Sequence, residues 1–115
     1  MRESKLWFIF ILAAIILIIV TSLHLMTFSS LVGTGYSEAL DFGSVIVRSS
    51  DVFYLGLYIV LLGAALYHGM YGVRRILLEL LTGTTKHTLI SYGCLIVGIV
   101  AFTYGSYVTI LSFIL

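Results

Sequence analysis

The 115-residue sequence contains no proline, one cysteine and few charged residues, which make up 10% of the chain. The single cysteine, Cys94, excludes an internal disulfide and a Cys-x-x-Cys site, and we interpret it as a small apolar residue in a packed helix. A formal net charge of +1 argues against nucleic-acid binding. The lack of proline and the 11 glycines favour uninterrupted helices over a β-barrel, which needs alternating segments of about ten residues.

Apolar residues dominate the composition. They form 61% of the sequence, and its mean hydropathy is +1.18, whereas soluble domains are about 45–50% apolar and about 25% charged. We therefore predict an all-α membrane protein with one domain, residues 1–115. Three stretches reach the roughly 20 residues that cross a bilayer, at about 6–28, 52–81 and 88–115. We expect the first to be a retained signal anchor, residues 29–51 a polar loop with room for a short interfacial helix, and residues 83–87 a tight turn.

The basic residues predict the orientation of these spans. Five of the six flank the first span or lie between the second and third spans, whereas the first loop has one arginine and three acidic residues. By the positive-inside rule, the N-terminus and the second loop are cytoplasmic, and the first loop and the C-terminus lie outside. The chain is thus expected to be a multi-pass protein of a cell membrane.

His68, in the second predicted span, is the strongest candidate for a functional residue. An ionisable side chain at membrane depth is costly, and by default it faces the protein interior and has a role there. Helical spacing brings Gly72, Arg75 and Glu79 onto the same side, and we call these four residues the His68 stripe. The stripe offers an imidazole, a gap without a side chain, a guanidinium and a carboxylate. This layout suits a haem ligand with room for the porphyrin, followed by groups for its propionates or for a quinone.

Neighbouring residues have weaker signals. Tyr71 flanks His68 and is placed to line a haem edge. Arg74 is expected to point about 120° away from Arg75, toward lipid head groups or a partner, and both arginines also fit a purely topological role. For Glu79, two interpretations stay open: a snorkelling or salt-bridged acid at the helix end, or a residue near a quinone.

His24, in the first span, lies at a different depth from His68. It is about four residues, or roughly 6 Å, from the outer end of its span, and His68 is about fifteen residues, or roughly 22 Å, from the same side. Because a difference of about 15 Å is too large for one iron, either each histidine binds its own centre or only one is a ligand. A second chain must supply the opposite ligands. The alternatives are a His24 bonded to a carbonyl or propionate, and a His68 that hydrogen-bonds between helices. We interpret His87 as a solvated turn residue.

The third span carries small residues at every seventh position, namely Ser91, Gly98, Gly105 and Ser112. In lipid, such a seam lets two helix backbones approach closely. We therefore expect this span to be a structural helix without a ligand.

The run LYHGMYGVR at residues 66–74, with Glu79 eleven residues after the histidine, resembles the membrane anchor subunits of succinate dehydrogenase, or complex II. Residues 22–26 and 45–54 are similar to the two-haem, two-anchor class of archaea and bacteria. The similarity extends over nearly the whole chain, and fumarate reductase anchors share the motif. Two positions depart from it, since the family's acid is usually aspartate rather than glutamate and a tyrosine that often follows is Leu80 here. These departures weaken the expectation of quinone contact.

The resemblance implies a haem b-binding anchor of succinate:quinone oxidoreductase in a prokaryotic cell membrane. Such a subunit passes electrons between an iron–sulfur subunit and membrane quinone, together with a flavoprotein subunit and a second membrane anchor subunit. One or two haems b would be shared with that second anchor, and dicarboxylate chemistry would lie in the other subunits, so this chain alone is not an enzyme. His68 matches the ligand of the haem nearer the cytoplasm, and His24 matches that of the outer haem. The other expected site residues are Gly72, Arg75 and Tyr71 at the cofactor, and Glu79 and Arg74 near quinone.

Three alternatives remain open at this point. The chain is compatible with a fumarate reductase anchor, with a haem-free structural anchor, and with a small proton- or solute-translocating protein that uses His68 and Glu79 as a relay.

Overall fold

A computed structural model describes residues 2–29, 35–81 and 83–115, and this part of the chain is helical. The long helices are α1 (Glu3–Met26), α4 (Val52–Leu80) and α5 (Thr84–Ile114), and the short ones are α2 (Tyr36–Ala39) and α3 (Phe42–Ser49). Each long helix contains a stretch long and apolar enough to cross a membrane. The predicted all-α fold with three membrane-spanning helices is therefore confirmed. Residues 30–34 of the predicted loop lie outside the described residues.

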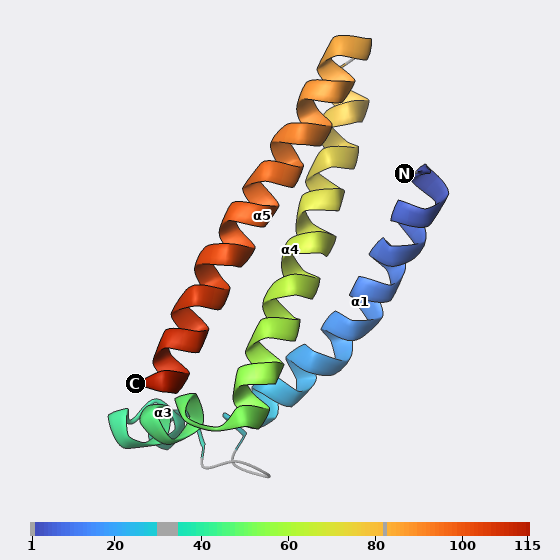
Figure 1. Ribbon diagram of the computed structural model, residues 1–115. Coiled ribbons are helices and arrows are strands. Elements are labelled where there is room, and N and C mark those ends of the chain that lie inside the picture. The colour runs from blue at the N-terminus through green and yellow to red at the C-terminus, as the bar shows by residue number, and fades with distance from the viewer. Residues whose placement is uncertain (1, 30–34, 82) are drawn as a thin grey trace.

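The central helix of the bundle is α4, which packs against both α1 and α5 (Figure 1). Among the described residues, α1 and α5 share no close backbone contact. The N-terminus and the α4–α5 connection lie toward one end of the bundle, which we call the turn end. The C-terminus and α3 lie at the opposite end, the α3 end. This topology places the two predicted cytoplasmic segments toward the same end, and which end faces the cytoplasm remains a prediction.

Aspartates cap the N-termini of α3, within the first loop, and of α4, directly after it. The side chain of Asp51 accepts a hydrogen bond from the backbone nitrogen of Phe53 at 2.7 Å, and Asp41 caps α3 in the same way through Gly43 at 3.1 Å. Such caps satisfy backbone donors that have no partner within the helix. The first loop thus contains a short helix, as expected, and its position at a membrane interface remains a prediction.

The connection between α4 and α5 is shorter than predicted. Gly83 has a φ of +120°, a conformation that side chains disfavour. The chain reverses there, and residues 84–87 already form the first turn of α5, where the nitrogen of His87 donates to the carbonyl of Gly83 at 3.0 Å. The prediction that residues 83–87 form the turn is therefore wrong, although His87 is exposed as expected.

Small residues of α5 line its contact with α4, as the seven-residue spacing predicted. A Cβ added at Gly98 would lie 3.5 Å from Cγ of Met70, and one added at Gly105 would collide with Leu62. Ser91 contacts α4 through Arg74. The fourth member, Ser112, is exposed and donates to the carbonyl of Val108 in its own helix. The predicted seam therefore holds for three of its four residues.

Most apolar side chains on the three long helices are exposed. Trp7 on α1, Ile76 on α4 and Leu89 on α5 have 57%, 59% and 71% of their surface accessible. Such a surface suits lipid or the helices of another membrane protein. Against this background, a charged residue among the few buried ones is conspicuous: Arg74 is only 9% exposed.

Candidate functional site

His68 lies on the side of α4 that packs against α1, and it is half-buried. Its Nδ1 atom lies 3.3 Å from the carbonyl oxygen of Phe10. The imidazole also stacks on the Phe10 ring, with centroids 4.2 Å apart and planes 5° apart. One residue of α1 therefore contacts both the edge and the face of the imidazole.

The contact between Nδ1 and a carbonyl oxygen determines the tautomer of His68. A carbonyl oxygen can only accept, so Nδ1 must carry the proton for a hydrogen bond to form. In the neutral ring, Nε2 then keeps its lone pair. Within the described residues, no hydrogen bond reaches Nε2. His68 thus has one nitrogen held by the protein and the other available to a metal ion.

Gly72 lies one helical turn after His68 and is half-buried. A Cβ at this position would lie 4.0 Å from Cε2 of Phe10, and no other described atom comes within that distance outside the local backbone. The expected gap in the His68 stripe is therefore present, and the Phe10 ring borders it on the α1 side.

His24 is half-buried between α1 and α4. Its ring meets Phe28 and Tyr58 edge-on, with centroid distances of 5.4 and 5.6 Å. The Nδ1 atom of His24 is buried and has no hydrogen-bond partner among the described residues. A buried polar atom without a partner costs free energy, which makes the environment of His24 unusual among the described residues.

The two histidines lie at separate levels along α4. His24 meets α4 at Tyr58, and His68 lies ten residues further along the same unbroken helix. At 1.5 Å per residue this is about 15 Å along the axis. The separation agrees with the depth difference expected from the sequence, and it rules out a single iron bound by both residues.

A polar cluster joins the three long helices at the turn end. The guanidinium of Arg74 forms an ion pair with Glu3 of α1, to which it donates two hydrogen bonds, one of them at 3.2 Å from Nη1. Its Nε donates to the hydroxyl of Ser91 at 2.9 Å, and the hydroxyl of Tyr71 donates to Glu3 at 3.2 Å. The expectation that Arg74 points toward lipid head groups or a partner is therefore wrong, because the side chain is buried between α1 and α5.

The far end of the His68 stripe is open. Arg75 and Glu79 are exposed, and the described residues offer neither of them an ion-pair partner within 4 Å. The structure therefore brings His68 and Gly72 together beside Phe10 and leaves Arg75 and Glu79 on the surface of α4. Both remain accessible to a group outside this chain.

Two residues at the site were not singled out in the sequence. Glu3 was not considered, and Phe10 was one apolar residue in an apolar run. One signal in the sequence could have revealed the ion pair. It was the combination of an acidic residue at the start of one span with an arginine late in an antiparallel span. Nothing in the sequence distinguishes Phe10 from its apolar neighbours.

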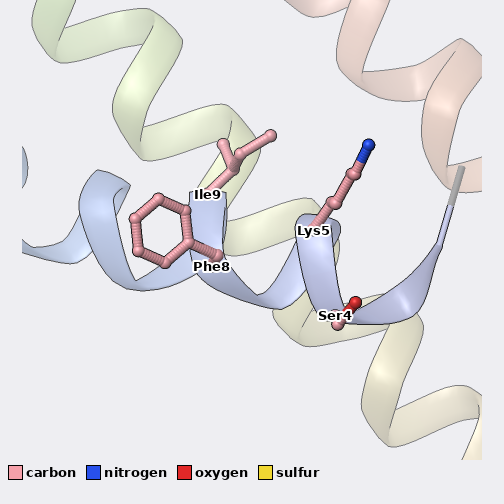
Figure 2. A pocket seen from close by; sticks show the side chains of 4 residues that line it. All are labelled: Ser4, Lys5, Phe8 and Ile9. Atoms are coloured by element: carbon pink, nitrogen blue, oxygen red, sulfur yellow. The ribbon is translucent and has the colours of Figure 1, made fainter.

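Two hollows lie near the turn end. One, of about 550 Å³, is lined by apolar residues of α4 and α5, with Arg74, Tyr67 and Leu6 at its edge. The other, of about 350 Å³, is shown in Figure 2, where the side chains of Ser4, Lys5, Phe8 and Ile9 project from α1. All of its lining residues belong to one helix, and by helical spacing they face away from Glu3 and Phe10. Neither hollow contains a histidine.

Histidine, cysteine and carboxylate side chains do not gather in groups of three in the described part of the chain.

Comparison with known proteins gives one match. A family described as the succinate dehydrogenase/fumarate reductase transmembrane subunit matches residues 2–107. No curated protein and no solved structure matches the chain significantly. The matched region includes α1, α4 and most of α5, and with them both membrane histidines and the polar cluster.

Proposed function

Because the chain belongs to the succinate dehydrogenase/fumarate reductase transmembrane subunit family, we propose that it binds haem b through His68 and passes electrons between an iron–sulfur subunit and membrane quinone. The family is a membrane subunit of a larger complex, so dicarboxylate chemistry belongs to other subunits. The observation that carries the proposal is the contact of His68 Nδ1 with the Phe10 carbonyl, which leaves Nε2 available as a ligand.

The residues around His68 fit a haem. A ligating histidine usually donates its other ring nitrogen to a carbonyl or carboxylate, which fixes the tautomer and the orientation of the ring. Phe10 provides such a carbonyl, and its stacked ring limits rotation of the imidazole. At Gly72, one turn after His68, α4 has no side chain to fill the space. The Tyr71 ring packs against the Phe10 ring of α1 beside it.

Haem supplies a one-electron carrier inside the low-dielectric membrane, with a potential that its axial ligands and their hydrogen bonds adjust. His68 would hold this haem for the present chain, and a second membrane anchor subunit would supply a further ligand. Arg75, which is exposed, would pair with a propionate.

A second haem b at His24 is a further part of the proposal. The separation of His24 from His68, about 15 Å along the bundle, supports a centre of its own. One centre would then lie toward each side of the membrane. With the predicted orientation in a prokaryotic cell membrane, His68 is the ligand nearer the cytoplasm, where the iron–sulfur and flavoprotein subunits would dock.

Quinone contact is assigned to the turn end. Glu79 is exposed there and has no ion pair among the described residues, so its carboxyl group could accept a hydrogen bond from a quinol hydroxyl. Arg74 is already paired with Glu3, which leaves it a less direct contribution. The physiological direction, succinate oxidation or fumarate reduction, follows from the potentials of the whole complex.

A reduced-minus-oxidised absorbance spectrum of the purified complex tests this function. The proposal predicts the bands of b-type haem, reducible by succinate or by a quinol. A complex of full subunit composition without those bands would instead support a haem-free structural anchor, and translocation of protons or solutes by a haem-free chain would support the transporter alternative.

A further inference from the structure

Three contacts join the first turns of α1 to α4 on the way from the turn end to His68. Glu3 pairs with Arg74, the carbonyl of Leu6 accepts from the hydroxyl of Tyr67 at 2.8 Å, and Phe10 contacts His68. On α1 the three residues are spaced by three and four, so they share one face, which we call the α1 contact face. Because the helices are antiparallel, Glu3 at the start of α1 meets the residue furthest along α4, whereas the partners of Leu6 and Phe10 are adjacent residues of α4.

The ion pair between Glu3 and Arg74 is the contact with the largest energetic cost if it is broken. Arg74 is 9% exposed in a helix of membrane-spanning length, where a buried guanidinium without a counter-ion is costly. In the described part of the chain, Glu3 is the one carboxylate in ion-pair contact with it. Ser91 and Tyr71 complete the hydrogen bonds of the pair from α5 and α4. Glu3 is therefore held at one level along α4.

The contact at His68 depends on that level. Its Nδ1-to-oxygen distance of 3.3 Å is already at the long end for a hydrogen bond, so a small slide of α1 along α4 would break it. Beyond Phe10, the buried residues of α1 are Ala13 and Val20, whose apolar contacts have no preferred direction. In Figure 1, α1 inclines away from α4 toward its N-terminus, where the long side chains of Glu3 and Arg74 meet.

We propose that Glu3 is a positioning residue for His68. Its pairing with Arg74 sets the register of α1 against α4, and this register holds the carbonyl and ring of Phe10 against the imidazole. The charge at the start of α1 thereby controls the orientation and the hydrogen bond of His68, which contacts Phe10, seven residues further along the α1 contact face. This inference rests on the proposed haem ligation by His68.

The test compares two glutamate-to-glutamine variants in the purified complex. Glu3→Gln removes the charge that pairs with Arg74, whereas Glu38→Gln removes an exposed carboxylate on α2 at the α3 end and serves as the control. We expect Glu3→Gln to keep its haem content but to shift the midpoint potential and the electron paramagnetic resonance g-values of the His68 centre. The His24 centre and the Glu38→Gln complex should match wild type. Glu3→Asp, which keeps the carboxylate, should return both values toward wild type.

A Glu3→Gln complex with wild-type potential and g-values at the His68 centre would overturn the proposal. If that complex does not assemble, Tyr71→Phe removes one hydrogen bond to Glu3 and should shift both values in the same direction. Unchanged values in Tyr71→Phe would likewise overturn it. A His68→Ala complex that keeps its full haem content would overturn the proposed function itself, a result that the Glu3 variants cannot produce.

Discussion

Phe10 of α1 and His68 of α4 lie with their rings stacked, 4.2 Å between centroids and 5° between planes, while the Phe10 carbonyl oxygen is 3.3 Å from the imidazole Nδ1. A stacked ring restrains rotation of the imidazole, and the carbonyl selects the tautomer with a free Nε2. The orientation of the His68 ring is therefore set by a neighbouring helix of the same chain.

Replacing Gly72 by leucine should lower haem occupancy at the His68 centre. A side chain at this position would extend into the gap that the Phe10 ring borders, with its Cβ only 4.0 Å from that ring. Gly93→Leu on α5 is the matched control, since a Cβ there meets nothing within 4 Å. Haem content per complex, measured by pyridine haemochrome, should fall in Gly72→Leu alone. Equal haem content in the two variants would show that the porphyrin lies elsewhere.

Replacing His24 by alanine should remove about half of the haem and leave the other centre reducible. The reason is the axial separation of His24 and His68, about 15 Å from the contact levels on α4. A redox titration of the variant should show one midpoint where the wild type shows two. A wild-type complex with a single haem would contradict this prediction, and His24 would then be a buried histidine with another partner.

Replacing Gly98 by leucine should destabilise the α4–α5 contact without changing the haem spectrum. A Cβ at Gly98 already reaches van der Waals distance from Met70, so the rest of a leucine side chain would overpack the seam, at a cost of about 1–3 kcal/mol. Thermal unfolding of the complex in detergent should therefore begin at a lower temperature. Gly93→Leu again provides the control, and an equal melting temperature for both variants would argue against close packing along this seam.

The fold could be predicted well from the sequence because its main features depend on the length and the spacing of residues along the chain. The length of each apolar stretch determines where α1, α4 and α5 can span a bilayer, and the structure places these helices close to the predicted residues. The spacing of Ser91, Gly98 and Gly105 likewise identified the side of α5 that meets α4.

The site was only partly predictable because helical spacing gives angles within one helix and not the position of its neighbours. Arg74 was correctly separated from Arg75, but the spacing could not show that α1 and α5 cover that side of α4. Phe10 was indistinguishable from the other apolar residues of its span, since its role comes from a carbonyl that every residue has. The α4–α5 turn was predicted too long because residues 84–87 contain threonines and a histidine, yet they already belong to α5, which begins directly after Gly83 with its positive φ.

The haem content of His68→Ala, measured per complex against His87→Ala, tests the central claim most directly. His87 is exposed in the first turn of α5, so its loss controls for removing an imidazole as such. The proposed ligation predicts that His68→Ala lacks one haem and retains any centre at His24, while His87→Ala matches wild type. Full haem content with an unchanged reduced-minus-oxidised spectrum in His68→Ala would contradict it.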